Sequence, residues 1–230
     1  MTINVKTNGS SLPMNNEDLG IVFNSHFLIA DPHPLFAQAL CSLLRKCGAQ
    51  NVQCVDDYGD IVRLAKVQPG TILIFNMSTP GSKGVLGLDR ILRNVKAKSV
   101  IVVLEHEDIA LENFCIERGV AGIISMLHTS EQITDVVTAV MLGEVHNFSR
   151  ISPLNEDEGD RAQLYQQIST LSPKETLVFT HLREGCLNKQ IAHRLELSEA
   201  TIKYHVGNIL RKLKCHSRTQ AAVIANRHGF

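Results

Sequence analysis

Residues 171–229 read LSPKETLVFTHLREGCLNKQIAHRLELSEATIKYHVGNILRKLKCHSRTQAAVIANRHG. Apolar residues recur in this stretch at the 3.6-residue period of an α-helix, and capping and turn residues divide it into four helices. Ser172 and Glu175 form the capping box that opens the first helix, and Gly185 ends it. The pattern therefore predicts an all-α domain at this end of the chain.

The second and third of these helices predict a helix-turn-helix. The second is expected over Asn188–Leu195, a turn follows at Glu196–Ser198, and the third is expected over Glu199–Leu213. One stripe of the third helix is apolar and predicts its core side, with Ile202, Val206, Ile209 and Leu213. The opposite face is polar and basic, which suits either a solvated surface or a helix that reads the major groove of DNA. Its members are Lys203, Tyr204, Gly207, Asn208 and Arg211.

The same stretch closely resembles the LuxR-type helix-turn-helix of NarL/FixJ response regulators. The matching pieces are LSPKE, EG…NKQIA, LSEATIKYHVGNILRKL and SRTQAA, which follow one another through the whole domain. The resemblance implies a sequence-specific transcription regulator that binds double-stranded promoter DNA and pairs in a dimer through the last helix, Arg218–Asn226. It places Lys203, Tyr204 and Gly207 at base-reading positions, and Asn188, Lys189 and Thr201 near phosphates. Gly207 departs from the longer or basic residue that many relatives have, which leaves the base preference open.

The chain has no net charge, but its two ends differ in sign. Residues 1–150 hold 12 basic and 15 acidic side chains, whereas residues 169–230 hold 10 basic and 4 acidic ones. A polyanion such as DNA would bind the basic end. The charge supports the DNA-binding prediction without carrying it, because a solvated surface can have the same charge.

Between residues 27 and 142, short apolar runs alternate with amphipathic segments. The runs are Phe27–Ala30, Val52–Cys54, Thr71–Phe75, Val100–Leu104 and Gly122–Ser125. Helical spacing marks Pro34–Lys46, Ile61–Lys66, Leu86–Val95, Ile109–Arg118 and Ser130–Leu142. Five strand–helix repeats predict a flavodoxin-like, doubly wound (βα)5 fold with a parallel sheet between two layers of helices.

The predicted fold class is therefore α/β plus all-α, in two domains. We expect a flexible extension over residues 1–24, the α/β domain over 25–146 and the DNA-binding domain over 168–230. A linker is expected over 147–167, because its acidic cluster at residues 155–160 cannot bury apolar area.

The α/β half resembles a phospho-receiver domain through the loops DPHPLF, NMSTPGSKG and GVAGII. In that family an Asp after the third strand accepts the phosphoryl group, and two acids after the first strand help to hold Mg²⁺. A hydroxyl residue and a Lys follow the fourth and fifth strands. The matching positions here are Asn76 for the acceptor, Asp31 and Pro32 for the acid pair, Glu105 for the hydroxyl and Met126 for the Lys.

These substitutions predict a receiver that cannot be phosphorylated. An amide is a poor phosphoryl acceptor, and a carboxylate at the hydroxyl position would repel a phosphoryl group. Control would then pass to dimerisation, to a partner regulator or to a small ligand. The alternative is that the chain acts mainly as a heterodimer partner and binds DNA weakly by itself.

The segment HNFSR (His146–Arg150) offers one hint of a ligand. Some relatives bind cyclic di-GMP through an aromatic-x-[Ser/Thr]-Arg-like motif at this place, where Phe148 can stack on guanine and Arg150 can bond it. A plain linker boundary is the favoured reading of this segment. The loop Gly81–Gly84 lacks the spacing of a phosphate-binding P-loop.

Several classes of protein are excluded by what the sequence lacks. It has no apolar run near the roughly 18 residues that cross a bilayer, and its start lacks a secretory layout, so a cytoplasmic, nucleoid-associated protein is expected. Its six Cys show no paired Cys/His spacing, so we expect no metal or cofactor and read them as small buried hydrophobes. No nucleophile–base pair is visible, so an enzyme is not expected.

Overall fold

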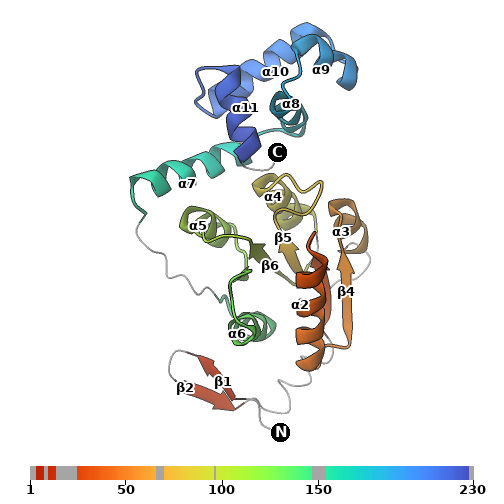
Figure 1. The fold of residues 1–230 in the computed structure, drawn as a ribbon, viewed down its shortest axis with the longest axis vertical. Helices are drawn as coiled ribbons and strands as arrows, with labels where there is room; N and C mark the ends of the chain where they lie inside the picture. Colours follow the sequence, from red (N-terminus) through yellow and green to blue (C-terminus); the bar gives the residue numbers. More distant parts are fainter. Residues whose placement is uncertain are drawn as a thin grey trace.

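A sheet of five parallel strands lies at the centre of the first half of the chain (Figure 1). The structure is a computed structural model, and it describes residues 4–7, 10–13, 25–65, 70–95, 97–146 and 154–227. The strand order is β4-β3-β5-β6-β7, so the order reverses once, beside β3. The strands are β3 (His26–Ala30), β4 (Asn51–Val55), β5 (Ile72–Asn76), β6 (Ser99–Leu104) and β7 (Gly122–Ser125).

Helices cover both faces of this sheet. They are α2 (Pro34–Lys46), α3 (Tyr58–Ala65), α4 (Val85–Asn94), α5 (Ile109–Glu117) and α6 (Ser130–Met141). Because neighbouring side chains of a strand point to opposite faces, each layer has its own core. The core under α2 and α6 includes Phe27, Ile29, Leu40, Leu44, Ile74, Ile101, Val136 and Val140. The core under α3, α4 and α5 includes Leu28, Ile61, Leu73, Phe75, Leu88, Ile91, Val102 and Phe114.

The doubly wound α/β fold is therefore confirmed, and the predicted strands and helices recur with small shifts at their ends. The exposure of each strand follows from its position at the centre or the edge of the sheet. Central β5 is buried throughout, whereas edge strand β4 is largely exposed. Within the described residues no helix is both long and apolar enough to cross a membrane.

The second half of the chain folds into helices. The four predicted ones are α8 (Pro173–Arg183), α9 (Asn188–Leu195), α10 (Glu199–Lys212) and α11 (Arg218–Arg227). Ser172 caps α8 in a complete capping box with Glu175, as predicted. Gly185 follows the end of α8 with a φ of 72°, a left-handed conformation that suits glycine.

A fifth helix, α7 (Glu156–Ser169), corrects the expected linker. Three of the acidic residues that were read as linker, Glu156, Asp157 and Glu158, occupy its first turn, where negative charge is favourable at a helix N-terminus. Asn155 caps the helix in a capping box with Glu158. Tyr165 and Ile168 are buried, so the segment does bury apolar area. In Figure 1 this helix lies between the sheet domain and helices α8–α11.

The N-terminal extension also differs from expectation. Strands β1 (Asn4–Thr7) and β2 (Ser10–Pro13) pair as an antiparallel ribbon where a flexible segment was predicted. Polar sequences of this kind carry little hydrophobic periodicity, so pattern reading did not find the two strands.

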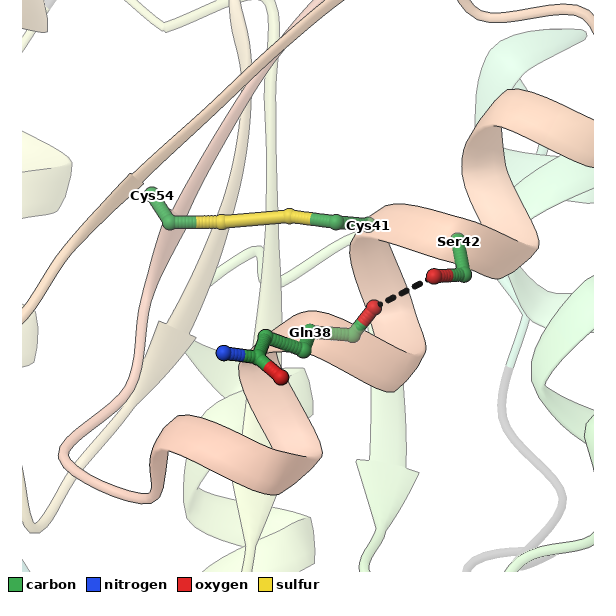
Figure 2. The surroundings of a disulfide bond; sticks show 4 residues. All are labelled: Gln38, Cys41, Ser42 and Cys54. Carbon is green, nitrogen blue, oxygen red and sulfur yellow. Dashed lines mark hydrogen bonds between the residues drawn. A yellow bond between two sulfur atoms is a disulfide. The ribbon is translucent and has the colours of Figure 1, made fainter.

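One pair of cysteines was also misread as separate buried hydrophobes. Figure 2 shows Cys41 of α2 joined by a disulfide to Cys54 of β4. The bond links a helix to the edge strand beside it. Cys47, Cys115, Cys186 and Cys215 form no disulfide, and three of these four are buried.

Candidate nucleic-acid interface

Helix α10 presents one buried and one exposed face. The Ser198 hydroxyl accepts a hydrogen bond from the Thr201 backbone N–H at 3.1 Å and so fixes where the helix begins. Ile202 and Ile209 have no exposed surface, and Val206 is also buried. This apolar stripe holds the helix against α8 and leaves its other face to solvent.

The outward face of α10 has the chemistry that base reading needs. Tyr204 is 67% exposed, which is unusual for a large aromatic side chain. The Lys203 Nζ lies 4.0 Å from the Glu199 carboxylate, a loose ion pair on the surface that costs little to break. Arg211 donates to the Asn208 side-chain oxygen at 2.9 Å. Each of these side chains can exchange its present contact for a base or a phosphate.

Gly207 lies in open space on the same face. A Cβ built at this position would meet no atom within 4 Å, outside the helix's own backbone. Packing therefore does not require glycine here. The absence of a side chain leaves room on this face for a close approach to the helix backbone.

The residues expected near phosphates lie in the first turns of α9 and α10. Lys189 is exposed, whereas Asn188 and Thr201 are partly buried. The Asn188 side-chain oxygen accepts a hydrogen bond from Arg218 of α11 at 2.6 Å. Arg218 also donates to the Cys186 carbonyl. Sequence reasoning missed this role of Arg218, because no local spacing joins residues 30 positions apart.

A partly buried ion pair joins α8 to α10. The Lys212 ammonium lies 2.6 Å from the Glu175 carboxylate and also donates to the Thr170 carbonyl at 2.8 Å. Burial alone would raise the pKa of Glu175, but hydrogen bonds from Lys212 and Ser172 outweigh it and hold the pKa below its ordinary value. This pair adds a polar link between α8 and α10 to their apolar contact.

In the sheet domain, polar side chains gather at the carboxyl ends of β3 and β5. The Asn76 amide nitrogen donates to the Asp31 carboxylate at 2.8 Å. The Asn76 side-chain oxygen accepts from the Ser78 backbone N–H at 2.8 Å, which sets the orientation of the amide. Both Asp31 and Asn76 are buried. The carboxylate is thus satisfied by the protein itself.

A histidine that sequence reasoning missed extends this network. Its backbone N–H donates to Asp31 at 2.7 Å, and its ring nitrogens lie 3.0 Å from Asp31 and 3.7 Å from Glu105. This residue is His33, which lies in the DPHPLF loop three positions after the strand. The structure therefore brings Asp31, Asn76 and Glu105 to one edge of the sheet. Pro32 and Met126 are partly buried residues that follow β3 and β7.

One set of side chains has the composition of a metal site. His181, Glu184 and Cys186 offer donor atoms that lie within 4.8 Å of one another. The Arg194 guanidinium of α9 already donates to Glu184 and approaches the His181 ring nitrogen at 3.4 Å. The Arg194 guanidinium therefore supplies the positive charge that a metal ion would supply at this place, and it joins α8 to α9. The predicted ligand residues Phe148 and Arg150 lie outside the described residues.

Comparison with known proteins matches both halves of the chain. The model of "Bacterial regulatory proteins, luxR family" matches residues 169–225, and that of the "Response regulator receiver domain" matches residues 27–138. The glycerol metabolism activator of Pseudomonas putida is 28% identical over 88% of this chain and 96% of its own length. The nitrate/nitrite response regulator protein NarL of Escherichia coli K12 is 25% identical over 85% of this chain and 92% of its own.

The fold is shared with a solved structure of a response regulator. RcsB from Salmonella enterica serovar Typhimurium, bound to promoter rprA in the presence of BeF3⁻, has a TM-score of 0.50 and 23% identity. The match covers 88% of this chain and 98% of that one. A receiver-type sheet domain, a LuxR-type helix-turn-helix and relatives that align over both halves lead to one family. The chain is a NarL/FixJ-type response regulator, a DNA-binding transcription regulator.

Proposed function

We propose that this regulator binds DNA through the exposed face of α10 without requiring phosphorylation of its receiver domain. The hydrogen bond from the Asn76 amide to Asp31 carries the proposal. A phosphorylatable receiver needs a carboxylate nucleophile beside a carboxylate-bound Mg²⁺. Here the acceptor position holds a neutral amide that donates one hydrogen bond to Asp31, the carboxylate that would bind the metal.

The surroundings of Asn76 support the same conclusion. Asp31 is the one acid of the expected pair, and it already accepts hydrogen bonds from Asn76 and His33. Glu105 stands where the resemblance places a hydroxyl, and its charge would repel a phosphoryl group. Met126 stands where a Lys would neutralise that group.

The proposal that the receiver domain is not phosphorylated is tested directly by measuring phosphoryl incorporation. The full-length protein is incubated with acetyl phosphate and Mg²⁺, and its mass and its affinity for promoter DNA are measured before and after. We expect no increase in mass and no change in affinity. An added phosphoryl group on the native chain would overturn the proposal.

The reading face has its own test in mobility-shift assays with promoter fragments. We expect Lys203→Ala and Tyr204→Ala each to lower specific affinity about ten-fold, because each removes a contact to a base or to the backbone beside it. Lys189→Ala should weaken binding equally on all sequences and reduce the salt slope by about one unit. Lys98→Ala, an equal loss of charge on the sheet domain, serves as the control. Unchanged binding by both α10 variants would exclude this face.

We propose a homodimer as the DNA-binding form. Val223 of α11 is 45% exposed, so the helix that the resemblance assigns to dimer pairing leaves an apolar side chain in solvent. Light scattering of the protein alone and with DNA tests this. A monomer that binds DNA only after another regulator is added would instead favour a heterodimer partner. Such a protein would act in the cytoplasm, at the nucleoid.

A further inference from the structure

The disulfide between Cys41 and Cys54 joins two elements that differ in how firmly the fold holds them (Figure 2). Helix α2 contributes Cys41, which is 8% exposed and belongs to the core between α2 and the sheet. Strand β4 contributes Cys54, which is exposed. This strand lies at the edge of the sheet, and in the described part of the chain it pairs with β3 alone. The bond therefore ties an edge strand to the core of the receiver domain.

Small reagents can reach this bond from the solvent side. Thiol–disulfide exchange begins when a thiolate attacks one sulfur of the bond, and Cys54 is the exposed partner. The sulfur of the buried Cys41 is then the leaving group. The two Cα atoms lie 7.7 Å apart, whereas most disulfides have Cα atoms about 4.4–6.8 Å apart. The same backbone therefore leaves room for two separate thiols as well as for the bond.

Both elements that the bond joins also hold Asp31. The Asp31 backbone N–H donates to the carbonyl of Val55, the residue after Cys54, at 3.2 Å. From the other side, the backbone N–H of His33 donates to the Asp31 carboxylate at 2.7 Å, and His33 is the N-cap of α2. A change in how α2 and β4 are held together therefore acts on the carboxylate that accepts from Asn76.

The other two cysteines of the receiver domain lack this combination of a partner and an exposed sulfur. Cys115 is buried, and burial, followed by the charges of Glu112 and Asp108, raises the pKa of its thiol. Cys47 is partly buried, and burial raises the pKa of its thiol as well. A raised pKa keeps a cysteine in the thiol form, which is a poor nucleophile. Cys47, which ends the same helix as Cys41, is therefore a matched control.

We propose that Cys41 and Cys54 form a reversible redox site, in which the disulfide fixes β4 and the contacts of Asp31 and its reduction loosens them. A hydroperoxide is the oxidant. The Cys54 thiolate attacks the O–O bond, which gives a sulfenic acid and one water after proton transfer, and the Cys41 sulfur then displaces the second water as the disulfide closes. The two sulfurs together lose two electrons and two protons.

Two small thiols reverse the reaction and are themselves joined in a disulfide, so the electrons balance in both directions. The inference rests on the proposed function in one respect, that a regulator working at the nucleoid meets cellular thiols. A disulfide in that compartment is usually transient and redox-sensing rather than structural.

Counting thiols in the denatured chain measures the state of the pair. Full-length protein is equilibrated without air in about 5 mM reduced glutathione, and a second sample is then freed of glutathione and treated with one equivalent of hydrogen peroxide. Alkylation and mass spectrometry should find six thiols in the first sample and four in the second. Cys47→Ser should keep the difference of two thiols between the samples, whereas Cys54→Ser should form no disulfide in either.

Hydrogen–deuterium exchange measures what the bond does to the fold. Reduction should make the backbone N–H groups of β4 and of Asp31 exchange about ten-fold faster, because the edge strand then depends on its pairing with β3. Cys54→Ser changes an exposed side chain and should exchange at the reduced rate under both conditions. Cys47→Ser should follow the native protein, and central strand β5 should exchange equally in both states.

Three results would overturn the inference. The first is a disulfide that survives equilibration with glutathione, because the bond would then be structural. The second is peroxide treatment that leaves six thiols or joins two chains through Cys54. The third is equal exchange of β4 in the oxidised and reduced protein. Each readout works without promoter DNA and without acetyl phosphate, so failure of the proposed function and failure of this inference are distinguishable.

Discussion

At the scale of single residues, Asn76 and Asp31 share one buried hydrogen bond of 2.8 Å. Asn76→Asp would replace it with two carboxylates at that distance. In the absence of Mg²⁺ we expect the free energy of unfolding of the receiver domain to fall by about 1–3 kcal/mol, because the pair repels and Asp31 loses a donor. Urea unfolding measures this, and millimolar Mg²⁺ should restore part of the loss by neutralising the pair.

The control for this prediction makes the same chemical change in solvent. Asn51 is exposed at the start of edge strand β4, so Asn51→Asp should change the free energy of unfolding by less than about 0.5 kcal/mol. If Asn76→Asp were as stable as the native chain without Mg²⁺, the hydrogen bond between Asn76 and Asp31 would not be what stabilises this pair in the absence of a metal ion. Asn76 itself could be singled out from the sequence because the resemblance to receiver domains places it at the acceptor position. His33 could not, because its partners come from two different strands.

At the scale of elements, hydrophobic period and caps predicted the sheet strands and most helices. Prediction failed at α7, where the acidic run was read as unable to pack, although Tyr165 and Ile168 stand one turn apart and are buried. Charge at a helix N-terminus and charge in a linker look alike in sequence. What distinguishes them is a tertiary partner, here α5 and α4, which pattern reading does not supply.

The Glu175–Lys212 pair gives the prediction at this scale. Lys212→Met leaves a buried carboxylate without its cation, so we expect the free energy of unfolding of the DNA-binding domain to fall by about 1–3 kcal/mol at pH 7. The folded-state pKa of Glu175 is lowered, so its contribution is present above the ordinary value of 4.5 and is lost as the pH falls through the lowered pKa. In Lys212→Met the loss of stability below pH 4.5 should be shallower. Urea unfolding from pH 3 to pH 7 measures both.

The matched change for this pair is Lys214→Met, which removes an exposed ammonium close by. It should leave stability within about 0.5 kcal/mol of the native chain. Equal effects of the two substitutions would mean that the Glu175–Lys212 pair contributes nothing beyond surface charge.

At the scale of the whole molecule, α7 joins the two domains through polar contacts with α5. Tyr165 donates to Asp108 at 2.8 Å, and Arg118 donates to Gln166 and Ser169, each at 2.8 Å. The Tyr165 ring also packs near Phe114, with centroids 6.1 Å apart. The position of the DNA-binding domain relative to the receiver therefore depends on how firmly α7 is docked. No motif in the sequence predicts these contacts, since each joins residues about 50 positions apart.

Tyr165→Phe tests this docking while keeping the ring. The partly buried Asp108 carboxylate loses its hydroxyl donor, so we expect the backbone N–H groups of α7 to exchange with deuterium about ten-fold faster. Burial, and then the Asp108 hydrogen bond, raise the pKa of Tyr165, so docking should hold below its ordinary value of 10.0 and weaken as the pH rises above it. Tyr58→Phe is the control, because that hydroxyl donates to the Gly87 carbonyl at 3.2 Å within the receiver. Faster exchange of α7 in the Tyr58 variant, or none in the Tyr165 variant, would show that the helix is held by its apolar contacts alone.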